Sequence, residues 1–247
     1  MTKEIFYVKT ALPLIGDPIV YPTQPCIVVP NKRVGVFYKK EASFPNEKIS
    51  KIVKKIFEKA GKEIMFFDFI KPQINLFEFQ QLALWCAAAL GIAYGRGKSA
   101  SVFANDMRSI LGKEYTKIFP LAYAGYTGFS VAFKGFEDPV VIYKKGLSIL
   151  KAQTADFGAF KQNKLDSYVN DVIAHSVGRL TVRCSEFLRK RMTKSLAECL
   201  NIFGCLVQAS SGDPAFLSLL QEHSLKLYND GALGCAYIPS WRIFVWL

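Results

Sequence analysis

The hydrophobic pattern changes its period near residue 45, and this change limits the fold more than any other feature of the chain. Residues 4–9, 26–30 and 33–39 are short apolar segments bounded by turn residues, which is typical of strands. Residues 46–60 instead place apolar side chains three and four positions apart with lysines between them, which predicts an amphipathic helix. Asn46 is a suitable cap for its first turn.

The later segments continue this mixture of strand and helix patterns. The expected elements are strands at 63–70, 130–136 and 139–145, helices at 76–90 and 211–228, two helix-rich segments at about 148–176 and 179–208, and two strands at the end of the chain. Strands therefore come first, helices fill the middle and strands return at the end. This order predicts an α+β fold, with mixed β-sheets and helices packed on one side.

The length, apolar runs and cysteines of the chain indicate its domain count and its cellular compartment. The chain has 247 residues, enough for one large domain or two small ones. No apolar run reaches the roughly eighteen residues of a membrane-spanning helix, and the first residues do not form a signal peptide. The six cysteines include no Cys-x-x-Cys pair, so we expect reduced, buried thiols and neither zinc nor disulfides. These features predict a cytoplasmic protein without a membrane anchor.

The net charge of +12 predicts an anionic partner. The densest basic runs, 51–62 and 189–194, lie on expected helices, where a charge run is usually a solvated face. No zinc-finger, helix-turn-helix or RNA-binding aromatic motif accompanies the charge. We therefore expect an anionic small molecule rather than nucleic acid. Charge alone motivates the third possibility, a basic nucleic-acid-binding α+β protein.

Residues 93–103, AYGRGKSASVF, contain the strongest candidate for a phosphate-binding loop. A P-loop needs a glycine five residues before Gly97, but Ile92 stands there, and a helix rather than a strand precedes the segment. Two other interpretations remain. Gly95 and Gly97 let the backbone approach an anion at the start of the next helix, or the segment is only a solvated turn between two helices.

The N-terminal segment YVKTALPLIGDPIVYPTQPCIVVPNKRVGVFYK resembles the opening of the GHMP kinases, the superfamily of galactokinase, homoserine kinase and mevalonate kinase. The matching positions, in order, are Leu12, Leu14, Ile15, Gly16, Asp17, Val20, Tyr21, Pro25, Arg33, Val34 and Val36. One departure is clear, because Lys9, Thr10 and Ala11 replace the Pro-Gly-Lys segment of the family.

The second superfamily motif is a Gly-Leu-Gly-Ser-Ser-Ala-Ser loop that wraps the triphosphate. GRGKSAS resembles it in composition and spacing, with Lys98 where the first serine would stand. In a competing register, residues 67–91 match the surroundings of this motif. Residues 95–106 would then correspond to a later segment that supplies an active-site aspartate, with Val102 at that position and Asp106 four residues further on.

The third motif, a glycine-rich turn near the C-terminus, resembles DGALGCAYI at Gly231 and Gly234. The resemblance therefore covers most of the chain in the right order. It implies a two-lobed GHMP-kinase-like fold, with a nucleotide-binding lobe at 1–130 and a second lobe at 131–247.

The resemblance also implies an activity, the transfer of the ATP γ-phosphoryl group to an alcohol or phosphate of a small metabolite with Mg²⁺, in the mevalonate branch. It assigns catalysis to Lys9, Asp17 and Asp106, nucleotide binding to Gly95, Gly97, Lys98, Ser99 and Ser101, the metal to Ser99, and substrate binding to Gly231 and Gly234. A homodimer is compatible with it. The missing Pro-Gly-Lys and the unmatched aspartate motivate an alternative, a GHMP-fold protein that has lost catalysis and acts in binding or regulation.

Overall fold

The computed structural model describes residues 5–70, 76–163 and 167–247 of the chain. Their contacts divide the chain into two compact units. The first comprises the described parts of Met1–Leu12, Val29–Val131 and Phe136–Leu147, and the second those of Pro13–Val28, Ala132–Gly135 and Ser148–Leu247. Each unit is built from separate chain segments. The single division at residue 130, with a nucleotide-binding lobe before it, stays a prediction.

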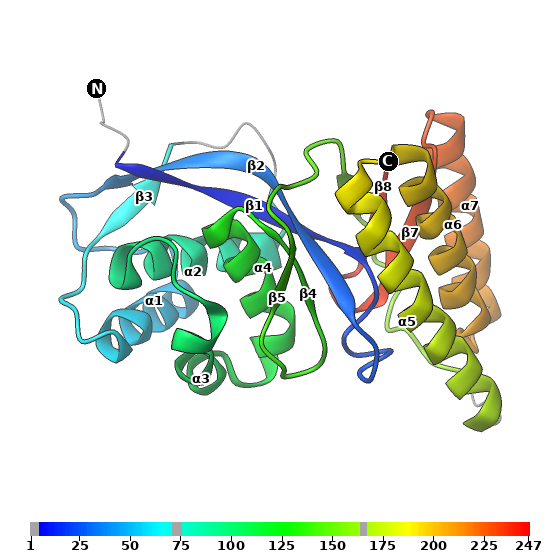
Figure 1. Ribbon diagram of the computed structural model, residues 1–247, viewed down its shortest axis with the longest axis horizontal. Coiled ribbons are helices and arrows are strands. Elements are labelled where there is room, and N and C mark those ends of the chain that lie inside the picture. The colour runs from blue at the N-terminus through cyan, green and yellow to red at the C-terminus, as the bar shows by residue number, and fades with distance from the viewer. Residues whose placement is uncertain (1–4, 71–75, 164–166) are drawn as a thin grey trace. The chain divides into compact units, whose positions relative to one another are not determined.

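The larger sheet has five strands (Figure 1). Its order is β1 (Phe6–Ile15), β2 (Cys26–Tyr38), β4 (Ser130–Phe133) and β5 (Val140–Tyr143), and β3 (Phe67–Phe69) pairs antiparallel with β2. The prediction of two strands at 26–30 and 33–39 is wrong, because β2 continues through Pro30. Proline lacks a donor but keeps its carbonyl acceptor, and this carbonyl accepts the N–H of Leu147 at 3.0 Å.

Four helices of the first unit lie on one side of strands β1 to β3 (Figure 1). They are α1 (Glu47–Lys59), α2 (Glu78–Tyr94), α3 (Ala100–Leu111) and α4 (Tyr115–Thr127), and a short 3-10 turn, η1 (Gly112–Glu114), precedes α4. The predicted cap of α1 is confirmed, because the Asn46 side chain accepts the N–H of Ile49 at 2.9 Å. The face of α1 that the spacing predicts to be apolar is buried.

Helix α4 was not expected from the sequence, although ten of its thirteen residues are buried. A helix buried nearly all round has no polar stripe to reveal its period, and Pro120 in its middle argues against a helix. Its close approach to β1 depends on Gly125, where a β-carbon would overlap the carbonyl oxygen of Lys9.

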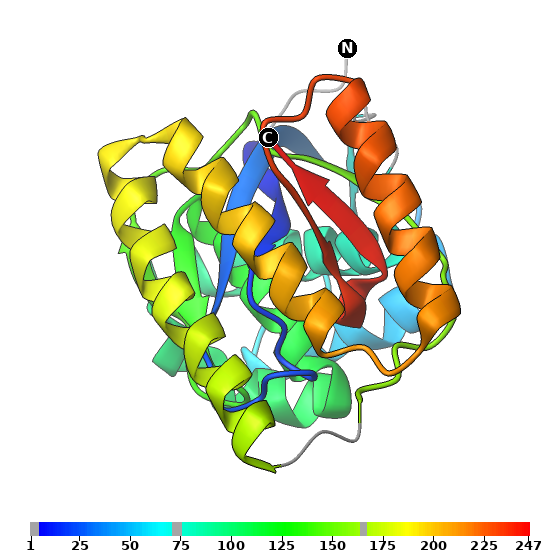
Figure 2. The same ribbon diagram turned by 90° about the vertical axis from the view of Figure 1, so that its right-hand side faces the viewer.

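The second unit has a three-stranded antiparallel sheet in the order β6 (Lys151–Thr154), β8 (Ile243–Trp246) and β7 (Cys235–Ile238). Helices α5 (Ser167–Lys190), α6 (Thr193–Ala209) and α7 (Pro214–Asn229) accompany it (Figure 2), and a short 3-10 turn, η2 (Pro239–Trp241), joins β7 to β8. Residues 151–154 were expected to be helical. They form a strand because β8, about ninety positions away in sequence, supplies the pairing partner.

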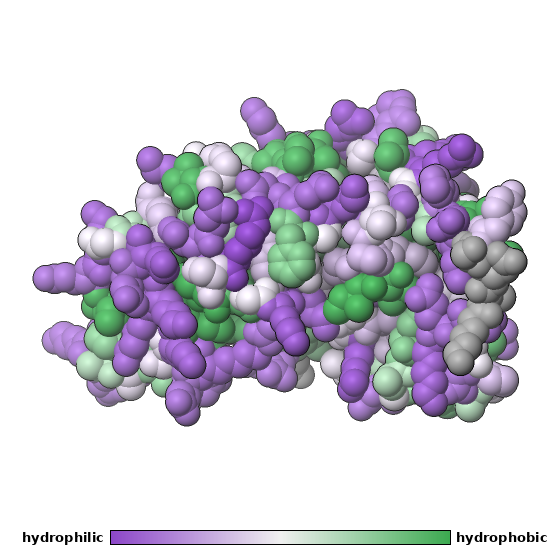
Figure 3. All heavy atoms as spheres, turned by 90° about the horizontal axis from the view of Figure 1, so that it is seen from below, coloured by the Kyte–Doolittle hydropathy of each residue, from purple (hydrophilic) through white to green (hydrophobic). Residues whose placement is uncertain are grey.

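Other expectations from composition can be checked directly. No helix in the described part of the chain is long and apolar enough to cross a membrane. All six cysteines are free thiols, and five are buried, whereas Cys205 is exposed. Hydrophilic side chains cover most of the face seen in Figure 3, with apolar residues in separate groups between them. Exposed lysines on α1 contribute to the solvated surface, as expected for a charge run.

We predict that Gly125→Ala lowers the free energy of unfolding by about 1–3 kcal/mol, because the new methyl group must push α4 away from β1. Gly91→Ala in α2 is the matched control, since its β-carbon would meet only the ring of Phe6, which is able to move. Chemical denaturation of both variants measures the difference. Equal stability of the two variants would contradict this account of the α4 contact.

Candidate functional site

The first unit contains a cavity of about 540 Å³ beside the loop at residues 95–99. Strands β1 and β5, the loop and the C-terminal half of α4 supply its walls. Its lining residues are Tyr7, Lys9, Arg96, Gly97, Lys98, Ser99, Tyr123, Gly125, Tyr126, Thr127, Gly128, Phe129, Val141 and Lys144. Three of the residues assigned to nucleotide binding and the predicted catalytic Lys9 therefore share one cavity.

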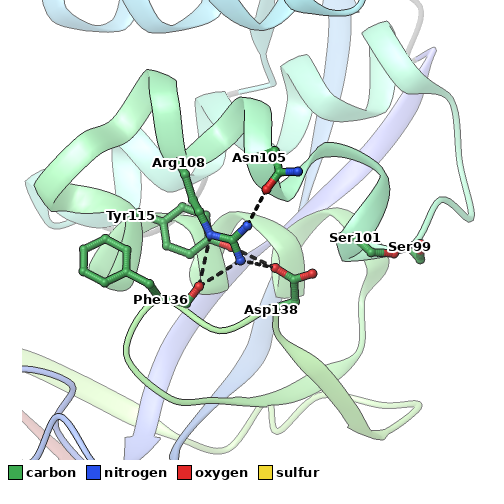
Figure 4. Close-up of polar contacts among 7 residues, drawn as sticks. All are labelled: Ser99, Ser101, Asn105, Arg108, Tyr115, Phe136 and Asp138. Carbon is green, nitrogen blue, oxygen red and sulfur yellow. Dashed lines mark hydrogen bonds and ion pairs between the residues drawn. The ribbon is translucent and has the colours of Figure 1, made fainter.

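The loop between α2 and α3 has the backbone geometry for which its glycines are suited. Gly95 and Gly97 have φ values of 75° and 82°, in the region that side-chain-bearing residues rarely adopt. Ser99 stands at the N-cap of α3, and its Oγ lies 2.9 Å from Oγ of Ser101 (Figure 4). The loop thus leads into a helix N-terminus, which favours negative charge.

A tyrosine hydroxyl from α4 already bonds to this loop. The Tyr126 hydroxyl accepts the N–H of Lys98 at 3.1 Å and donates to the carbonyl of Gly95 at 2.5 Å. Tyr123 lies three residues earlier on α4 and also lines the cavity. Burial raises the pKa of both tyrosines, so both hydroxyls stay protonated near neutral pH. The backbone donor of Lys98 is therefore not available to an anion unless Tyr126 moves.

Four cationic side chains line the cavity, whereas no carboxylate is among the described residues of its lining. Arg96 lies over the ring of Tyr7, with 5.3 Å between its Cζ and the ring centroid. Lys9 extends along Gly128, where a β-carbon would come within 3.7 Å of Nζ. Among the described residues, no acidic partner pairs with Lys9, Lys98 or Lys144. This uncompensated positive charge is suited to an anionic ligand.

A clamp around Arg108 holds the chain after β4 against α3 (Figure 4). Its guanidinium donates to the carbonyl of Phe136 at 3.1 and 2.9 Å, to Asp138 at 2.5 Å and to Asn105 at 2.7 Å. It also lies 5.2 Å from the ring centroid of Tyr115. Because the clamped segment leads directly into β5, the clamp helps to position Val141 and Lys144 on the cavity wall.

Asp106 and Ser101 do not line the cavity. Asp106 accepts a hydrogen bond from the Tyr94 hydroxyl at 3.0 Å. Burial, followed by this bond, raises the pKa of Tyr94 to about 12. Asp106 lies seven positions after Ser99 on α3, which is about 10 Å along the helix axis. The competing register, in which this segment supplies an active-site aspartate, stays a prediction.

Asp17 belongs to the second unit and is 1% exposed. Its carboxylate accepts the N–H groups of Ile19 and Val20, each at 2.9 Å. It also accepts the N–H of Ser240 at 2.7 Å and the Ser240 hydroxyl. These bonds tie the turn after β1 to η2. These bonds give the Asp17 carboxylate a structural role. The catalytic role that the family resemblance implies for Asp17 remains a prediction.

Gly231 and Gly234 also lie in the second unit. Gly231 is exposed, has a φ of 88° and donates its N–H to the carbonyl of Tyr228 at the end of α7. Gly234 is buried against α6, where a β-carbon would overlap the carbonyl group of Ala197. These contacts explain why glycine occupies both positions, and the predicted substrate contacts remain predictions.

The cavity does not offer a set of Mg²⁺ ligands. Proteins usually hold Mg²⁺ through one or two carboxylates together with substrate phosphates. Ser99 supplies a hydroxyl, which already contacts Ser101. The described residues contain no group of three or more His, Cys, Asp and Glu side chains that would hold a metal. The donors around Ser99 therefore do not fit the metal that the superfamily uses.

These features define a class of protein, because the chain has a GHMP-kinase-like α+β fold, as its sequence predicts. No family model and no curated protein sequence matches the chain. Its similarity to solved structures carries the assignment of the fold.

The structure is similar to the mevalonate kinase of Methanococcus jannaschii, with a TM-score of 0.60 and 9% sequence identity over 98% of this chain and 90% of that one. It is also similar to the L. major mevalonate kinase in complex with R-mevalonate, with a TM-score of 0.57 and 14% sequence identity over 100% of this chain and 90% of that one. A third similar structure is the mevalonate pyrophosphate decarboxylase of Streptococcus pyogenes, with a TM-score of 0.55 and 9% sequence identity over 99% of this chain and 89% of that one. All three are GHMP superfamily members.

Sequence reasoning missed several residues of the cavity. Tyr123 and Tyr126 lie on the helix that it did not predict, and Lys144 directly follows β5. The spacing of Tyr123 and Tyr126 gave a weak signal, since residues three positions apart share a helix face. Nothing local to Lys144 distinguishes it from the other lysines of the chain.

We predict that Tyr126→Phe loosens the loop, because it removes both hydrogen bonds of the hydroxyl. Hydrogen exchange at residues 95–98 should become faster, and the free energy of unfolding should fall by about 1 kcal/mol. Tyr7→Phe is the control, since Tyr7 also lines the cavity but makes no such bond to the loop. Unchanged exchange in Tyr126→Phe would show that the hydroxyl does not fix the loop.

We predict that Asp17→Asn lowers the free energy of unfolding by roughly 2–4 kcal/mol, because an amide supplies one acceptor oxygen where a buried carboxylate serves four donors. Asp213→Asn is the control. Asp213 caps α7 by accepting two N–H groups, and asparagine caps helices equally well. Loss of an enzymatic activity without loss of stability would instead support the catalytic role of Asp17.

Proposed function

We propose that this protein is a divergent GHMP-type kinase that transfers the γ-phosphoryl group of ATP to a small metabolite. The observation that carries the proposal is the cavity, in which four cations and a glycine-containing loop meet in a GHMP-kinase-like fold. Phosphoryl transfer requires mainly positioning and charge stabilisation from the protein. A cavity rich in lysine and arginine supplies both to a phosphorylated ligand.

Five residues of the cavity have a proposed part in this function. Lys98 and Arg96 bind phosphate oxygens from the loop, and Lys9 on β1 and Lys144 directly after β5 neutralise charge. Ser99 donates its hydroxyl to a phosphate oxygen. When ATP is bound, the bond from its γ-phosphorus to the bridging oxygen breaks as the acceptor oxygen bonds to phosphorus, and the acceptor proton passes to a base.

The acceptor is proposed from the mevalonate branch, since a structural neighbour is a mevalonate kinase in complex with R-mevalonate. Asp17 and Asp106 remain candidates for the base, and Gly231 and Gly234 remain candidates for acceptor contacts. A cytoplasmic location and a homodimer are part of the same proposal.

A second candidate is a GHMP-fold protein that binds phosphorylated ligands without turnover. The lining of the cavity favours it, because the described lining residues include no carboxylate to act as a base or to hold Mg²⁺. Both candidates share the anion site and differ in whether a phosphoryl group moves.

Calorimetric titration with Mg·ATP tests the shared site, and we expect measurable binding by the wild-type protein. Gly97→Asp should weaken it at least tenfold, about 1.4 kcal/mol, because it introduces a carboxylate among the four cations. Gly158→Asp is the matched control. Gly158 has the same φ of 82° and open surroundings but lies in the second unit.

Turnover distinguishes the two candidates. Incubation with Mg·ATP and mevalonate or its phosphates should yield ADP and a new phosphate ester, measured by phosphorus NMR. Binding without turnover would favour the second candidate. The absence of any nucleotide binding by the wild-type protein would contradict both.

A further inference from the structure

The described lining of the cavity holds cations without carboxylates to balance them, and this charge bears on which form of a nucleotide the cavity binds. Its described lining residues include Lys9, Arg96, Lys98 and Lys144 and no aspartate or glutamate. A divalent cation seated among bound phosphates is attracted by carboxylates and repelled by ammonium groups. The donor set is therefore suited to the phosphates and unsuited to a metal ion beside them.

The position of Lys98 strengthens this conclusion. Lys98 lies directly before the N-cap of α3, where the helix dipole adds partial positive charge. Its side chain is exposed, and no hydrogen bond or ion pair of its ammonium group occurs within the described residues. Its backbone N–H, by contrast, is bonded to Tyr126. The loop therefore presents an exposed ammonium group to an anion instead of a free backbone amide.

The other cations approach from different elements. Lys9 comes from β1, Arg96 from the loop and Lys144 from the end of β5, so the positive groups surround the cavity. The aromatic rings of Tyr7, Tyr123, Tyr126 and Phe129 also line the cavity and are suited to stack on a base or a sugar. Several ammonium groups are thus available to replace the charge that a divalent ion would provide.

We propose that this cavity binds the metal-free form of a nucleoside triphosphate in preference to its Mg²⁺ complex. The inference rests on the anion site of the proposed function and specifies the form of its ligand. The metal-free nucleotide carries more negative charge than its Mg²⁺ complex. The positive charges of Lys9, Arg96, Lys98 and Lys144 balance this additional negative charge. By linkage, the bound nucleotide then holds Mg²⁺ more weakly than the free nucleotide does, by the same factor.

Paired calorimetric titrations of the full chain test this preference. One uses ATP in excess EDTA, and the other uses ATP with saturating Mg²⁺, both at the same ionic strength because salt screens exposed charges. We expect metal-free ATP to bind about tenfold more tightly. Lys98→Met should weaken the binding of metal-free ATP by about tenfold and reduce the preference for the metal-free form. Lys144→Met, on another element, should act in the same direction.

Lys51→Met is the control, since Lys51 is an exposed lysine of α1 that does not line the cavity. It should leave both affinities within about twofold. Equal binding of the two forms, or tighter binding of Mg·ATP, would overturn this inference and leave the proposed kinase intact. A failure of both forms to bind would instead overturn the anion site and the proposed function with it.

Discussion

The close contact between α4 and β1 is the constraint on which the cavity depends. Gly125 lets the helix approach the carbonyl of Lys9, and this approach brings the following turn of α4 to the loop. Tyr126 then bonds to both Gly95 and Lys98, and Tyr123 lines the cavity beside it. A larger residue at position 125 would move the helix and these hydroxyls with it.

The same contact sets the chemistry of the site. Because the Tyr126 hydroxyl occupies the backbone donor of Lys98, we expect the binding of an anion to depend on side chains. Arg96, Lys98 and Lys144 are exposed and Lys9 is half-buried, and none of the three lysines has an acidic partner among the described residues, so their charge remains available to a ligand. The site thus combines a glycine-containing loop with lysine and arginine side chains, and no carboxylate lies among the described residues of its lining.

The Arg108 clamp helps to position the β5 side of the cavity. It bonds Asp138 and the carbonyl of Phe136 to α3, the helix that begins at the loop. Helix α3 therefore connects the two sides of the cavity, with Ser99 at its start and Arg108 in its last turn. In the second unit, Asp17 stabilises a turn in a similar manner, which explains the presence of a buried carboxylate without reference to catalysis.

The sequence by itself determined the features that depend on neighbouring residues. These include the cap of α1 at Asn46, the glycines of the loop and the α+β class. Only the tertiary structure decided which distant side chains meet. Helix α4 was hidden because burial on all sides removes the polar stripe that marks a helix. Lys144 joined the cavity, and Asp17 met Ser240, for the same physical reason: these partners lie far away in sequence, and only packing brings partners of that kind together.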